Sequence, residues 1–206
     1  IEIVFIIDRS GSMGDDISNV RDNVRDFTEL LESQGIEYRL GLLSYESSVT
    51  RYDLTEDVEV FRDNLNEIPS SGGTENGLDA IMEALNDYIF YSNSIKYFVI
   101  IGDEPITSRY GYSQHDVENA LSSDEVILTS VGVPGIYSIV DTTGGLSLDI
   151  GGDFSNQLTE IFEQIQQIPI LDIISPRQDQ WLGENDSAFI PAVEVTDPDN
   201  DELVFN

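Results

Sequence analysis

The chain has no cysteine, one lysine and one histidine among its 206 residues. The lack of cysteine excludes a disulfide framework, but it leaves the compartment open because many exported bacterial proteins also lack cysteine. No apolar run reaches the length that a membrane-spanning helix needs, so direct membrane insertion is not expected. The sequence begins inside a predicted strand, without methionine, and we expect it to be a piece of a longer protein.

Basic residues are also scarce. Forty acidic residues stand against nine basic ones, which gives a formal net charge of −31. Nucleic acid and anionic membranes are therefore poor partners. Such a surface repels itself unless salt or divalent cations screen it. Two overlapping interpretations stay open: a salt-adapted or extracellular protein, and a protein that works in calcium- or magnesium-rich water.

Apolar patterning predicts alternating strands and helices over most of the chain. The segment IEIVFIID (1–8) is a continuous apolar run that ends in Asp8, which is typical of a strand buried on both faces. The predicted order is strand 1–8, helix 15–34, strands 37–47 and 49–54, helices 58–68 and 78–89, strand 95–103, helix 115–122, strands 125–133 and 146–150, and helix 158–168. This alternation predicts an α/β fold: a doubly wound, mainly parallel sheet with helices on both faces.

Composition changes at Pro169. From Ile170 onward there is no helical period, and short alternating runs such as AVEV and ELVF lie among prolines. We therefore expect two parts, an α/β domain over residues 1–168 and, over 169–206, a linker with the start of a β-sandwich domain.

Oxygen-bearing side chains follow the predicted strands where ligands gather in such folds. Asp8, Ser10 and Ser12 lie on the turn after the first strand, Thr74 lies in the glycine-rich loop SSGGTENG, and Asp103 ends the strand IKYFVIIGD. These hard oxygen donors suit Mg²⁺, Mn²⁺ or Ca²⁺ rather than zinc or copper. Five side chains do not saturate such an ion, so a carboxylate from another protein could complete its ligand shell.

The Asp-x-Ser-x-Ser turn, the later threonine and the second aspartate together resemble the metal-ion-dependent adhesion site of the von Willebrand factor type A family. The resemblance covers about residues 1–168 and implies that Ser10 and Ser12 bind the metal directly. It implies that Asp8, Thr74 and Asp103 bind directly or through water, and that the partner supplies a glutamate or aspartate. One departure is Glu104, where the family often has glycine. Glu104 is either an ordinary surface residue or an extra charge that favours calcium or tunes the partner.

The end of the chain has a second resemblance. The segment LGENDSAFIPAVEVTDPDNDELVF is similar to the opening of a cadherin-like repeat of bacterial surface proteins. Such repeats bring an early glutamate and a later Asp-x-Asp onto calcium, because acidic residues on an extended turn aim several oxygens at one flexible shell. The corresponding residues here are Glu184, Asp197, Asp199 and Asp201. The alternative is an acidic turn in an acidic protein.

The sequence fits an enzymatic function poorly. A phosphoryl-transfer aspartate usually has a second acid two residues later and a lysine nearby, but Ser10 takes that position and Lys96 lies at the other end of its strand. The sequence GSMG is not the Gly-x-Ser-x-Gly motif of hydrolases, and the single histidine, His115, lies in a polar stretch. We expect no enzymatic activity.

These observations predict a metal-dependent adhesion module of a larger extracellular or cell-surface protein, whose partner presents a carboxylate. Loops 45–48, 104–114 and 134–145 are expected to shape specificity, and the closing helix (155–168) to shift on ligand entry, as the resemblance implies. Two alternatives remain: a von Willebrand A-type subunit of an intracellular ATPase or chelatase assembly, and a scaffold domain without metal-dependent binding.

Overall fold

The computed structural model describes residues 1–69, 72–151, 153–168, 170–173 and 193–196. The chain divides into two compact units, Ile1–Ile161 and Phe162–Asn206, which are described separately below. No helix within the described ranges is long and apolar enough to cross a membrane.

The first unit is built on a 6-stranded sheet with the order β3-β2-β1-β4-β5-β6. Parallel pairing joins β1 to both β2 and β4, then β4 to β5 and β5 to β6, and only β3 pairs antiparallel, with β2. The strands are β1 (Glu2–Asp8), β2 (Arg39–Tyr45), β3 (Val49–Thr55), β4 (Lys96–Ile101), β5 (Val126–Val131) and β6 (Ser147–Leu148). The predicted mainly parallel sheet and the hairpin of its second and third strands are confirmed.

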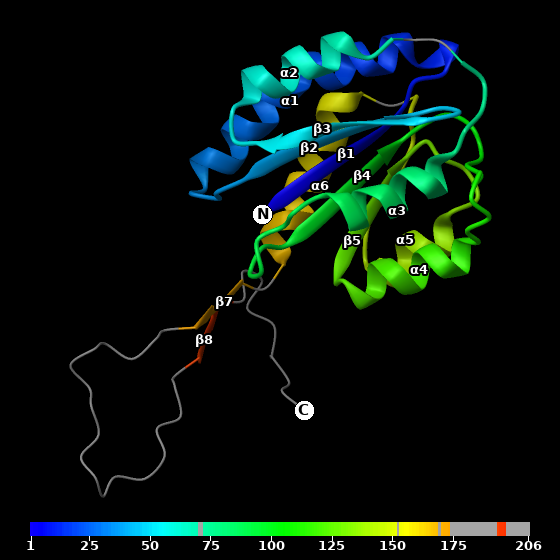
Figure 1. Cartoon of the computed structure of the whole chain (residues 1–206). Helices are drawn as coiled ribbons and strands as arrows, with labels where there is room; N and C mark the ends of the chain where they lie inside the picture. Colours follow the sequence, from blue (N-terminus) through cyan, green and yellow to red (C-terminus); the bar gives the residue numbers. More distant parts are fainter. Residues whose placement is uncertain (70–71, 152, 169, 174–192, 197–206) are drawn as a thin grey trace, which may run out of the picture. The chain divides into compact units, whose positions relative to one another are not determined.

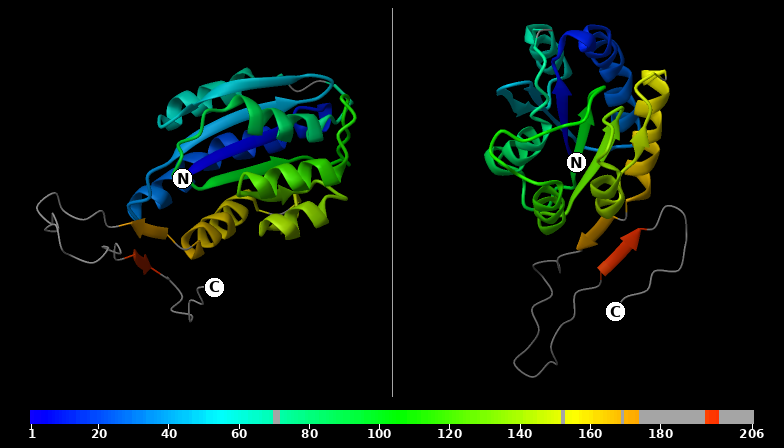
Figure 2. Two further views of the ribbon diagram at one scale, coloured as in Figure 1. Left: turned by 60° about the horizontal axis from the view of Figure 1, so that its bottom comes forward. Right: turned by 90° about the vertical axis from the view of Figure 1, so that its right-hand side faces the viewer.

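Helices cover both faces of this sheet (Figures 1 and 2). On one face Phe5 of β1 lies against Phe27 and Phe61, with ring centroids 6.5 and 5.3 Å away. These rings come from the two helices that follow the first strand and the hairpin. The helices are α1 (Gly14–Ser33, after the 3-10 turn η1 at Gly11–Met13), α2 (Val58–Glu67), α3 (Gly77–Asp87), α4 (Gln114–Ser123), α5 (Tyr137–Thr143) and α6 (Phe154–Gln167).

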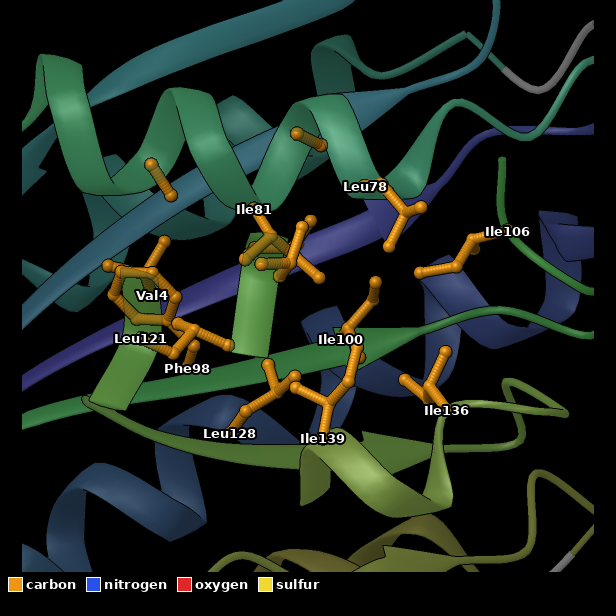
Figure 3. Packing of buried hydrophobic residues seen from close by; sticks show 14 of the residues in the cluster. Val4, Leu78, Ile81, Phe98, Ile100, Ile106, Leu121, Leu128, Ile136 and Ile139 are labelled. Atoms are coloured by element: carbon orange, nitrogen blue, oxygen red, sulfur yellow. The ribbon is translucent and has the colours of Figure 1, made fainter. Parts of the chain in front are cut away.

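The opposite face of the sheet holds a continuous apolar cluster against α3, α4 and α5. Figure 3 shows Leu78 and Ile81 of α3 near Phe98 and Ile100 of β4, and all four are buried. Because successive strand residues point to opposite faces, Val4 joins this cluster while its neighbour Phe5 faces α1 and α2. Both faces of β1 are therefore covered, which explains its continuous apolar sequence.

Two expectations about the helices were wrong. Residues 134–145 were expected to be a loop, but they contain α5, which is short and rich in β-branched residues, and buries Ile139 and Val140 one helical turn from Ile136. Ile89 was expected to continue the apolar face of the third helix. That helix ends at Asp87, and Ile89 lies beyond it with 86% of its surface exposed.

In the second unit, β7 (Ile170–Ile173) pairs antiparallel with β8 (Val193–Thr196). The rest of the predicted β-sandwich lies outside the described residues. The same holds for the predicted calcium ligands Glu184, Asp197, Asp199 and Asp201.

Candidate metal centre

Asp8 ends β1 at the carboxyl edge of the sheet and is fully buried. The turn that follows folds back onto its carboxylate: the Ser10 amide donates to Asp8 Oδ1 at 2.7 Å. The hydroxyl oxygens of Ser10 and Ser12 lie 3.0 Å apart, and the Met13 amide donates to the Ser10 carbonyl at 3.1 Å as the chain enters η1. The structure therefore brings Asp8, Ser10 and Ser12 together at one turn, as the sequence predicted.

The Asp8 carboxylate is only half satisfied. Its Oδ2 atom is buried and has no hydrogen-bond partner within the described part of the chain. Burial raises the pKa of Asp8, the hydrogen bonds from Ser10 oppose this, and the negative charges of Asp103 and Glu104 raise the pKa further. A buried carboxylate surrounded by negative charge favours either a proton or a bound cation.

Asp103 lies two residues beyond β4, on the exposed segment that leaves the same edge. Gly102 brings this segment close to β1, since a Cβ atom built there would lie 3.3 Å from Asp8 Cβ and 2.8 Å from Tyr45 Oη. A side chain at position 102 would therefore push the segment away from Asp8. Glu104 is exposed, and its negative charge adds to that of Asp103 in raising the pKa of Asp8.

Thr74 lies on the exposed loop before α3. Backbone hydrogen bonds hold the end of this loop at the carboxyl edge: the Asn76 amide donates to the Glu46 carbonyl at 3.3 Å, and the Thr107 amide donates to the Glu75 carbonyl at 2.6 Å. Burial raises the pKa of Glu75, and the charges of Asp8, Glu104 and Asp103 add to this. The loop of Thr74 thus belongs to the same edge as the two aspartates.

Two residues near the aspartates and the Thr74 loop were not predicted from the sequence to belong to this site. Tyr45 ends β2 directly opposite Asp8, and its hydroxyl is buried without a hydrogen-bond partner among the described residues. Burial, followed by the charges of Asp8, Glu75 and Asp103, raises its pKa well above the ordinary value. Asp16 in the first turn of α1 also has a raised pKa, from burial and then from the charge of Asp103. Only the register between β1 and β2 could have predicted that Tyr45 lies beside Asp8. From the sequence, Asp16 is explained as an acidic residue in the first turn of a helix, where the helix dipole favours it.

The donor set fits a hard divalent cation. The described residues hold no group of three His, Cys, Asp or Glu side chains that could bind a metal, so carboxylates alone do not make this site. The candidate set combines two carboxylates with the hydroxyls of Ser10, Ser12 and Thr74, which suits Mg²⁺, Mn²⁺ or Ca²⁺. Asp8 Oδ2, which is buried and has no hydrogen-bond partner in the described ranges, is the atom that such an ion would satisfy.

The molecule is thus an α/β domain with a doubly wound sheet and an acidic, hydroxyl-lined carboxyl edge. It belongs to the von Willebrand factor type A domain family, whose model matches residues 2–168. The search of curated proteins found no match.

Solved structures with the same fold come from several kinds of protein. The chain resembles an aerotolerance-related membrane protein from Bacteroides fragilis with a TM-score of 0.62 and 14% identity, covering 82% of this chain and 100% of that one. It resembles the pilus adhesin SpaC from Lactobacillus rhamnosus GG with a TM-score of 0.58 and 16% identity, covering 80% of this chain and 30% of that one. It resembles the SpRpn10 VWA domain with a TM-score of 0.56 and 15% identity, covering 77% of this chain and 94% of that one.

Proposed function

We propose that the chain is a metal-dependent protein-binding module of the adhesive kind. Asp8, Ser10, Ser12, Thr74 and Asp103 would hold a divalent cation, Mg²⁺ or alternatively Mn²⁺ or Ca²⁺, at the carboxyl edge of the sheet. When bound, the ion would supply a coordination position for a carboxylate of the partner. The observation that carries this proposal is the buried Asp8 carboxylate, which has negative neighbours and one oxygen without a hydrogen-bond partner among the described residues.

The chain's own residues would perform three tasks in this function. Asp8 supplies a charged oxygen that the fold keeps in a fixed place, since β1 is fully buried. The Ser10 amide fixes the other oxygen, Oδ1, so the carboxylate does not rotate freely. Gly102 lets the Asp103 segment approach Asp8 without a steric clash. The arrangement is therefore preorganised before any partner arrives.

The proposed setting is an extracellular or cell-surface protein. The pilus adhesin among the similar structures and the acidic surface support this setting, because calcium- or magnesium-rich surroundings screen a net charge of −31. Calcium in the end segment, on Glu184, Asp197, Asp199 and Asp201, belongs to the same proposal. The intracellular assembly subunit and the metal-free scaffold stay as alternatives, and absence of metal-dependent carboxylate binding would favour the scaffold.

Binding of a simple carboxylate tests the proposal without knowledge of the partner. The probe is an N-acetylated, C-amidated glycine-rich peptide with one aspartate, titrated into ¹⁵N-labelled protein with Mg²⁺ or with chelator. We expect amide signals of the turn after β1 and of Gly102 to shift with Mg²⁺ only, and not in Asp8→Asn. Asp53→Asn on β3 is the matched control, because it removes an equal charge from an exposed position. Equal shifts with chelator, or in Asp8→Asn, would contradict the proposal.

A further inference from the structure

Arg109 differs from the other basic side chains in the described part of this acidic protein. The chain has nine basic residues, and eight of them lie in the described part, Arg177 being the exception. Seven of the eight donate hydrogen bonds to protein oxygens: Arg9, Arg21, Arg25, Arg39, Arg51, Arg62 and Lys96. The Arg109 guanidinium makes no such bond to a described residue, and its central carbon lies 5.9 Å from the centre of the Tyr110 ring.

The segment that carries Arg109 is firmly attached beside the candidate metal centre. Asp79 of α3 is 4% exposed, and it accepts hydrogen bonds from the Ser108 hydroxyl and, at 2.8 Å, from the Arg109 amide. Ile106 is buried near Leu78 (Figure 3), and a Cβ atom at Gly77 would lie 2.5 Å from Ile106 Cγ2. The backbone at Arg109 is therefore fixed, while its charged end is exposed.

This segment and the candidate centre share one edge. The Thr107 amide donates to the Glu75 carbonyl, and the next residue, Asn76, donates its amide to the Glu46 carbonyl, one residue after the partner of Asp8 in the β1–β2 register. Arg109 also lines a pocket of about 160 Å³ with Ser47, Ser48, Asn76, Tyr110 and two acidic residues, Asp79 and Glu83. On its other side, Ser48 accepts a hydrogen bond of 3.4 Å from Arg9, the residue next to Asp8. The pocket is thus a neighbour of the proposed site for the partner's carboxylate.

We propose that Arg109 is the anchor for a second acidic group of the partner. The binding partner is then a segment with two acidic groups, one for the metal centre and one for the guanidinium beside it. An exposed guanidinium without a carboxylate partner is an available donor pair for an anion. Asp79 does not compete, because two donors of the Ser108–Arg109 segment already hold its oxygens. This inference rests on the proposed function, since the first acidic group needs the metal centre.

Peptides with one and two acidic residues test the inference. The probes are N-acetylated, C-amidated glycine-rich peptides with one aspartate, with two aspartates separated by two to five residues, or with one aspartate and one lysine at the same spacings. Each is titrated at saturating Mg²⁺ into ¹⁵N-labelled wild type, Arg109→Ala and Arg25→Ala. Arg25 is the matched control, since it is exposed, belongs to α1 and removes the same charge.

We expect the best two-aspartate peptide to bind wild type roughly three- to tenfold more tightly than the one-aspartate peptide, which is a twofold statistical factor for two equivalent aspartates multiplied by the effect of an exposed ion pair. This preference should fall to about twofold, the statistical factor alone, in Arg109→Ala and persist in Arg25→Ala. If the full preference persists in Arg109→Ala, or if wild type shows no more than the statistical factor, the second anchor is wrong although the metal centre stands. If the lysine peptide binds best and Glu83→Gln abolishes that preference, the pocket takes a cation instead. If no peptide binds in a Mg²⁺-dependent way, the proposed function fails, and this inference fails with it.

Discussion

Strand β1 carries a buried carboxylate at each end, and the two carboxylates differ in what surrounds them. Glu2, at the amino end, is 1% exposed and accepts hydrogen bonds from Arg39, from Ser94 and, at 2.9 Å, from the Tyr91 amide. Asp8, at the carboxyl end, is 0% exposed and keeps one oxygen without a partner in the described residues.

The charges around the two groups differ in sign. Glu2 forms an ion pair with Arg39, whose guanidinium also lies 3.8 Å from the centre of the Tyr91 ring. Asp8 instead has the negative charges of Asp103 and Glu104 nearby, and both raise its pKa. A buried charge is tolerated when it is paired and hydrogen-bonded, so Glu2 is a structural group. Asp8 carries a cost in the metal-free protein, which is expected of a site built to bind something else.

The largest effect is expected at the amino end. Glu2→Ala leaves the half-buried Arg39 without its carboxylate, and breaking a buried ion pair of this kind costs about 3–5 kcal/mol. Urea denaturation followed by circular dichroism should record this loss in the free energy of unfolding. Glu2→Gln, which keeps the shape and an oxygen acceptor, is the control and should lose less. A loss below about 1 kcal/mol in Glu2→Ala would contradict a structural role for this ion pair, because Glu2 would then be no better satisfied than Asp8.

Divalent cation should stabilise the protein through the carboxyl end alone. At a Mg²⁺ concentration one hundred times the dissociation constant, the gain in the free energy of unfolding is about 2.7 kcal/mol. The same denaturation experiment with Mg²⁺ and with chelator measures it. We expect the gain to disappear in Asp8→Asn and to persist in Glu2→Gln. A gain that survives in Asp8→Asn would place the ion elsewhere.

Two serine-to-alanine substitutions distinguish the two ends of β1 further. Ser94→Ala removes a donor to the Glu2 carboxylate and should cost about 1.5–3 kcal/mol, as for other hydrogen bonds to charged groups. Ser12→Ala removes an exposed hydroxyl and should change the stability of the metal-free protein by no more than about 0.5 kcal/mol. It should nevertheless weaken Mg²⁺ binding in a calorimetric titration. If Ser12→Ala binds Mg²⁺ like wild type, Ser12 is not a ligand.

The smallest expected effect is a pH dependence of the metal-free protein. A folded-state pKa of Asp8 above its ordinary value of 3.8 means that the folded protein binds more protons than the unfolded chain over that interval. The contribution of Asp8 to stability is thus present below pH 3.8 and is lost as the pH rises through the folded-state pKa. Denaturation with chelator at several pH values above 3.8 should show a weaker trend in Asp8→Asn. An unchanged trend would mean that Asp8 is not the titrating group.

Much of this fold could be predicted from the sequence, because each strong signal is local. The buried strand IEIVFIID, the helical periods and the two aspartates that follow apolar strands each lie within a few residues. The same locality explains the turn Asp8–Ser12, whose internal hydrogen bonds span two residues.

The features that the sequence did not predict depend on distant contacts. The Glu2 carboxylate accepts hydrogen bonds from Arg39, Tyr91 and Ser94, which lie 37, 89 and 92 positions further along the chain. No local sequence pattern predicts contacts at such separations. Tyr45 meets Asp8 through the β1–β2 register, which apolar periodicity does not specify. The sequence did not predict α5 because its seven residues are mostly β-branched or polar, which weakens a helical pattern.

The most direct test of a metal centre at the carboxyl edge is a calorimetric titration of Mg²⁺ into chelator-stripped wild type, Asp103→Asn and Glu104→Gln. The two variants each remove one charge from adjacent exposed positions, so general electrostatics changes alike in both. We expect one saturable site at the carboxyl edge in wild type and Glu104→Gln, and its loss in Asp103→Asn. No saturable binding in wild type, or equal binding in Asp103→Asn, would contradict a metal centre at this edge of the sheet.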